Sequence, residues 1–128
     1  MAKLTAKELI AKKGLIEDKK NKKIEIEVPD VGTFSFRLPN MLDYEDAEAY
    51  GKNRDNSGYE QNKYLLYACC LEPNLKDEEL LKGFEVTAGI DLIDKLLMVG
   101  EVSTIAQILV KKAGFDKEAF KVVEKLKN

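Results

Sequence analysis

Histidine and tryptophan are both absent from this sequence of 128 residues. Without histidine the chain lacks the usual general base, the commonest metal ligand and any Ser-His or Cys-His nucleophile. The two cysteines, Cys69 and Cys70, are adjacent, so a disulfide between them would be strained and two sulfurs alone cannot complete a zinc site. We expect buried, unreactive thiols, with a redox pair as the alternative, and no metal, cofactor or enzymatic activity.

Long apolar runs are also missing. No segment approaches the ~20 apolar residues that a membrane-spanning helix requires. The first residues, MAKLTAKELIAKK, contain no long apolar segment and no small-residue cleavage site, so secretion is not expected. With 45% hydrophobic and 34% charged residues, the chain is predicted to form one cytoplasmic domain over residues 1–128.

Acidic residues are plentiful but do not form a recognisable active site. Asp43, Glu45, Asp46 and Glu48 fall on a predicted short helix, and three further acids begin another helix at residue 77. Carboxylates at the start of a helix are explained by the helix dipole without any catalytic role. The polar stretch 51–58 does not match a phosphate-binding loop, and its composition predicts a flexible connection.

Charge is unevenly distributed along the chain, although the net charge is only −2. Residues 1–23 contain eight lysines and three acids, which gives +5. Residues 24–110 contain seventeen acids and seven bases, which gives −10, and residues 111–128 carry +3. Such segregation favours steering of partners or of neighbouring subunits, or simply reflects solvated helix faces. Nucleic-acid binding is not favoured, because no aromatic residue lies among the lysines.

The N-terminal third predicts a helical arm followed by a hairpin. Capping-box spacing from Thr5 to Glu8 predicts a helix over residues 6–18, within a peripheral basic arm over 1–22. Alternating apolar residues on both sides of a Pro-Asp-x-Gly turn predict an antiparallel β-hairpin over 23–39. Its apolar face must pack on helices, and Arg37 is expected to pair across the strands with Glu25 or Glu27.

Residues 40–128 predict a helical core. Apolar spacing, prolines and glycines place helices over 41–50, 59–71, 77–84, 90–99, 101–113 and 116–127. The helix over 59–71 is apolar on nearly all sides, so we expect it at the centre. The predicted fold is therefore mainly α, of the α+β class: a compact bundle of short helices with the hairpin packed on it.

The order of these segments resembles a known family. The resemblance rests on the TAKELIAKK segment, the hairpin, the polar loop and the residues at the predicted helix boundaries. These boundary residues are Glu72-Pro73, Gly83-Phe84, Gly100-Glu101-Val102 and Ala113-Gly114-Phe115. The family that the chain resembles, over nearly its whole length, is that of the XkdN-like tail assembly chaperones of tailed phages and prophages.

This resemblance implies a non-catalytic protein of phage tail assembly. It implies binding to the tape-measure protein, which is kept soluble while tail-tube subunits polymerise around it. The tail-tube protein and further copies of this chain are additional possible partners. The resemblance also implies action in the cytoplasm of the bacterial host and absence from the mature virion.

Four apolar residues are candidates for the partner-binding surface: Leu92, Leu96, Met98 and Val99. They belong to helices that are apolar on more than one side, and they could equally fill the core. A helix laid into a groove is the expected mode of contact, and the flexible Met98 side chain suits an adaptable surface. Two alternative functions remain. One is a small DNA-binding regulator or adaptor using Lys117, Lys121 and Lys125, and the other is a structural tail component retained in the virion.

Overall fold

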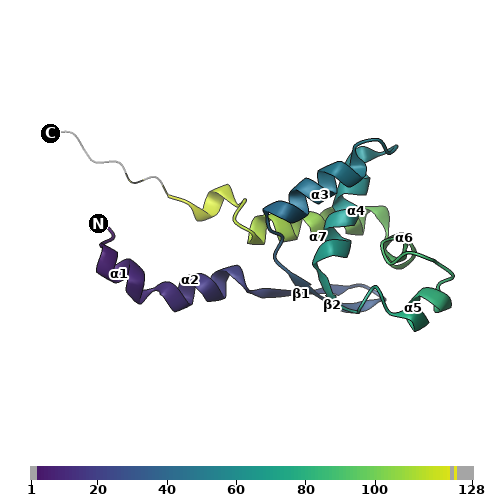
Figure 1. Cartoon of the computed structure of the whole chain (residues 1–128), viewed down its shortest axis with the longest axis horizontal. Helices are drawn as coiled ribbons and strands as arrows, with labels where there is room; N and C mark the ends of the chain where they lie inside the picture. Colours follow the sequence, from purple (N-terminus) through teal and green to yellow (C-terminus); the bar gives the residue numbers. More distant parts are fainter. Residues whose placement is uncertain (1–2, 122, 124–128) are drawn as a thin grey trace.

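The computed structural model describes residues 3–121 and residue 123, and it confirms the α+β class. Within this part of the chain, two helices precede the hairpin of a small sheet, and two more lie between that hairpin and the third strand (Figure 1). The elements in order are α1 (Ala6–Ala11), α2 (Lys13–Lys20), β1 (Lys23–Val28), β2 (Gly32–Arg37), α3 (Met41–Gly51), α4 (Ser57–Cys69), β3 (Cys70–Glu72), α5 (Glu78–Gly83), α6 (Asp91–Leu96), α7 (Val99–Lys112) and the 3-10 turn η1 (Lys117–Ala119).

The sheet contains the predicted hairpin and one further strand. β1 pairs with β2 in antiparallel register, with Ile24 opposite Phe36, and the turn uses positive φ angles at Asp30 and Gly32. The expected cross-strand pair of Arg37 with a glutamate is wrong, because the register puts Lys23 opposite Arg37. β3 adds to the other side of β2, giving the order β1-β2-β3.

Helices cover one face of this sheet (Figure 1). Side chains alternate between the two faces along each strand, so one face carries Ile24, Val28, Phe34 and Phe36. These residues belong to a core shared with α4, α6 and α7. As expected, α4 is central, since it packs against α3, α6, α7 and β2. Its Leu66 and Cys69 are fully buried between these elements.

Three helix boundaries differ from the prediction. The N-terminal helix is divided at Lys12 into α1 and α2. The helix predicted over 59–71 starts earlier, at Ser57, and ends at Cys69, where the chain enters β3. The break predicted at Gly100 falls instead at Leu97 and Met98, because Glu101 accepts a hydrogen bond from the Met98 N–H at 2.8 Å and fixes the start of α7.

The helix predicted over 116–127 is only partly within the described residues. There, Asp116 is followed by the three-residue turn η1, and residues 120, 121 and 123 are not helical. Residues 122 and 124–128, which include most of the second half of this predicted helix, lie outside the part of the chain that the structure describes.

The N-terminal helices project from the body of the molecule (Figure 1). Neither α1 nor α2 contains a buried residue. Their apolar side chains are therefore open to solvent, with Ile10 73% and Leu15 70% exposed. The described end of the chain after α7 points to the same side of the molecule as α1 and α2 (Figure 1).

Candidate partner-binding surfaces

A metal site, a membrane helix and a reactive thiol would each require particular features of the described residues. In residues 3–121 and 123, no three His, Cys, Asp or Glu side chains are grouped to hold a metal ion. Over the same part of the chain, no helix is long and apolar enough to cross a membrane. Burial raises the pKa of Cys69 to about 12 and that of Cys70 to about 11, so both thiols stay protonated near neutral pH.

Asp43, one of the clustered acids, holds three elements together. Its carboxylate accepts hydrogen bonds from Arg37 at 2.6 and 2.8 Å and from the Asn40 N–H at 2.8 Å. Arg37 also donates to the Ala68 carbonyl at 3.0 Å, which links β2, α3 and α4. The hydrogen bond from Arg37 lowers the pKa of Asp43, and burial opposes this only partly. This arrangement is a structural clamp with both charges satisfied.

A second network, around the buried Lys63, joins α4 to α6. Lys63 is buried, and its Nζ lies 2.9 Å from carboxylate oxygens of both Glu60 and Asp94. The Tyr59 hydroxyl donates to Asp94 at 2.6 Å. Burial alone would lower the pKa of Lys63. Its two carboxylate partners raise that pKa by more than burial lowers it, so the net pKa shift is upward. The lysine is therefore charged and paired, and it positions α6 against the central helix.

The four predicted contact residues separate into core and surface. Leu92 is fully buried, and Leu96 is half-buried against the same core. Met98 and Val99 instead are 74% and 70% exposed at the start of α7. Leu92 therefore fills the core in this structure. Of the four, Met98 and Val99 present freely accessible apolar surface.

A shallow groove of about 320 Å³ lies between β1 and α7, and its lining on α7 begins at Gly100, two residues after Met98. Ile26, Val28 and Pro29 form one wall, and Ile105 and Ile108 contribute to the other. Glu101 also lines this groove, and its carboxylate accepts the hydrogen bond from the Met98 N–H. We call the groove together with Met98 and Val99 the α7 surface. Sequence periodicity could not reveal it, because it requires the contact between the hairpin and α7.

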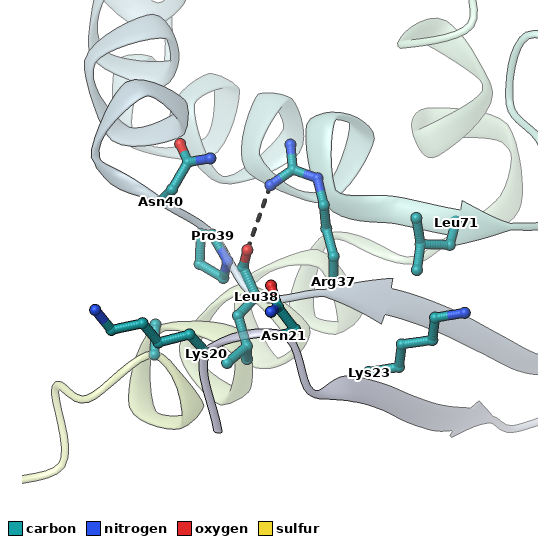
Figure 2. Close-up of a pocket in the computed structure, with 9 residues that line it drawn as sticks. Lys20, Asn21, Lys23, Arg37, Leu38, Pro39, Asn40 and Leu71 are labelled. Carbon is teal, nitrogen blue, oxygen red and sulfur yellow. Dashed lines mark hydrogen bonds between the residues drawn. The ribbon is translucent and has the colours of Figure 1, made fainter. Parts of the chain in front are cut away.

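The second hollow lies where the N-terminal helices join the body (Figure 2). This pocket of about 610 Å³ is lined by α2 and its end, the β2–α3 connection and the end of α7. Its lining residues are Lys20, Asn21, Lys23, Arg37, Leu38, Pro39, Asn40, Leu71 and Ala113. Figure 2 shows Arg37 donating to the Leu38 carbonyl, a bond of 3.3 Å.

A groove along α1 and α2 continues from this pocket. Leu9, Ile10 and Ile16 give it an apolar floor, and Lys13, Glu17 and Lys20 complete its lining. Lys20 lines both hollows, so the two meet there. We call this second groove the arm groove. The predicted helix over 6–18 supplies all of its lining residues except Lys20.

These features define a small α+β domain with exposed apolar grooves, a class of protein suited to binding other proteins. Residues 16–127 match the family described as phage XkdN-like tail assembly chaperone protein, so the chain belongs to that family. The family is non-catalytic. No curated protein and no solved structure matches the chain. The match begins inside α2 and therefore includes the α7 surface but only part of the arm groove.

Proposed function

We propose that this tail assembly chaperone binds the tape-measure protein and keeps it soluble while the tail tube forms. It would act in the cytoplasm of the bacterial host and be absent from the finished virion. Membership of the family supports a role with tail proteins. The observation that carries the proposal is the α7 surface, where Met98 and Val99 stand exposed at the start of the helix whose following residues line an apolar groove.

A tape measure is a long helical protein whose apolar stripes would aggregate if left uncovered. An amphipathic helix can lay such a stripe into a groove of a folded partner. Fully burying a side chain such as Met98 or Val99 contributes about 1.5–3 kcal/mol. Since about 1.4 kcal/mol changes a dissociation constant tenfold, either residue alone can decide whether a segment stays bound.

Co-expression with a tape-measure fragment tests this proposal. The wild-type chain should keep the fragment soluble and co-purify with it, whereas Met98→Asp and Val99→Asp should weaken binding at least tenfold. Leu15→Asp is the matched control, because Leu15 is equally exposed but lies outside the α7 surface. Leu92→Asp is unsuitable, since a carboxylate in the core would unfold the protein. Unchanged binding by both α7 variants would exclude this surface.

Two measurements separate the alternatives. Mass spectrometry should not detect the protein in purified virions. Its detection there would identify the protein as a structural tail component. A salt-dependent shift with duplex DNA would indicate a regulator. The lysines that such a regulator would need, Lys117, Lys121 and Lys125, gain no support from the structure, because only the turn Lys117–Ala119 is helical among the described residues there.

A further inference from the structure

The N-terminal arm, which consists of α1 and α2, is short, basic and exposed, and we expect it to need a partner surface for stability. Its helices contain six and eight residues, and neither buries a side chain against the rest of the chain. Isolated helices shorter than about 12–15 residues are only marginally stable in water. The apolar floor of the arm groove would supply the missing stabilisation if another surface covered it. Residues 1–23, which contain the arm, carry a net charge of +5, so that surface should be acidic.

The exposed side of α3 has the complementary properties. The helix contains four acidic residues and no basic ones. Asp43 is used in the structural clamp, whereas Glu45, Asp46 and Glu48 are exposed and take part in no ion pair among the described residues. Two large apolar side chains, Met41 and Leu42, are 71% and 62% exposed at the start of the same helix.

The arm does not cover α3 of its own chain. Only residues 21 and 22 separate α2 from β1, and the arm continues away from the body beyond the sheet (Figure 1). Among the described residues, therefore, none covers the arm groove or the outer side of α3. A second molecule can supply each with its complement.

We propose that the arm of one copy docks on α3 of a second copy. The apolar floor made by Leu9, Ile10 and Ile16 covers Met41 and Leu42. Lys13 and Lys20, which flank that floor, face the unpaired carboxylates of α3. Each copy offers one arm and one α3, so the contact either closes by reciprocal exchange or continues from copy to copy.

The mass of the full chain in solution tests this contact. Light scattering after size-exclusion chromatography should give at least a dimer at tens of micromolar protein, with more dissociation at high salt because part of the contact is electrostatic. Ile10→Asp and Leu42→Lys should each give a monomer with an unchanged circular dichroism spectrum of the body. Leu15→Asp should keep the wild-type mass, because Leu15 does not line the arm groove.

A charge exchange makes the test specific for the two surfaces. The variant Lys13→Glu/Lys20→Glu and the variant Glu45→Lys/Glu48→Lys should each be monomeric alone. Mixed in equal amounts they should associate, because the altered arm meets the altered α3 while the native arm meets the native α3. All substituted side chains are exposed, so these variants should fold. A monomeric wild-type chain, wild-type mass in Ile10→Asp, or no association on mixing would each overturn the proposal.

The test of this contact is independent of tape-measure binding. It is measured on the purified chain alone, and it uses none of the residues of the α7 surface. A failure of the co-expression test would therefore leave the self-association result unaffected, and the reverse also holds.

Discussion

Replacing Asp43 with asparagine should destabilise the fold by removing one charge from the clamp between β2, α3 and α4. The substitution keeps the size of the side chain and leaves the Arg37 guanidinium without its anionic partner. In the wild-type protein the Asp43 side chain is 9% exposed and that of Arg37 is 37% exposed. The carboxylate therefore depends on its hydrogen-bond partners, whereas the guanidinium can partly return to water.

We expect this change to lower the free energy of unfolding by about 2 kcal/mol at pH 7. Hydrogen bonds to charged groups contribute about 1.5–3 kcal/mol each, but the partial exposure of Arg37 and the acceptor oxygen retained by asparagine reduce the loss. Removing one member of a fully buried ion pair would cost more, about 3–5 kcal/mol. The exposed Asp46 on the same helix supplies the control Asp46→Asn, for which a change within about 0.5 kcal/mol is expected.

The difference in the free energy of unfolding between Asp43→Asn and the wild type should depend on pH, and this dependence identifies the clamp as the cause of the lost stability. The pKa of Asp43 is lowered in the folded protein from its ordinary value of 3.8. Its contribution to stability is therefore present above about pH 4 and is lost as the pH falls through the lowered folded-state pKa. Asparagine does not titrate, so the difference in the free energy of unfolding between the two proteins should become smaller below about pH 4.

Urea unfolding followed by far-UV circular dichroism measures both effects, because helices form most of the described chain and tryptophan is absent. Two results would refute the reasoning. One is a stability of Asp43→Asn equal to that of Asp46→Asn at pH 7. The other is a gap from wild type that stays constant between pH 7 and pH 3.

Three further predictions concern other parts of the core. Asp94→Asn should lower the free energy of unfolding by about 1 kcal/mol in the same assay, less than Asp43→Asn, because Lys63 keeps its contact with Glu60. Gly89→Ala should cost at least about 2 kcal/mol, since the added Cβ would clash with the Leu75 carbonyl oxygen in the β3–α5 connection. Cys69 should resist alkylation at pH 8 until denaturant is added, as followed by mass spectrometry, because burial raises its pKa to about 12.

Local pattern was enough to predict the elements whose residues repeat with a regular period. The hairpin follows from strict alternation on both sides of a turn, and the register of Ile24 with Phe36 places those apolar residues on the buried face. The central place of α4 follows from apolar residues on nearly all its sides. The peripheral arm is expected as a basic segment because of its many lysines, and neither of its helices contains a buried residue.

Features that depend on contacts between distant segments could not be predicted in the same way. β3 has only three residues, of which Cys70 and Leu71 continue the apolar run of α4, so it is too short for a period of two to show. The clamp joins Arg37 to Asp43 and to Ala68, and only the folded β2, α3 and α4 bring these groups together. The start of α7 depends on one hydrogen bond to the Met98 N–H, so a glycine two residues later gave the wrong boundary.

The two proposed contacts use different parts of the molecule, and this separation has a consequence for tape-measure binding. If copies are linked through arm and α3, neighbouring α7 surfaces act at a high effective concentration along one long helical partner. Weak single contacts then hold the partner collectively, yet each copy can leave alone as the tube advances. Ile10→Asp should therefore keep wild-type affinity for a short tape-measure segment that fills one α7 surface, but lose the ability to keep a long fragment soluble. Equal loss for short and long fragments would show instead that the arm contacts the tape measure directly.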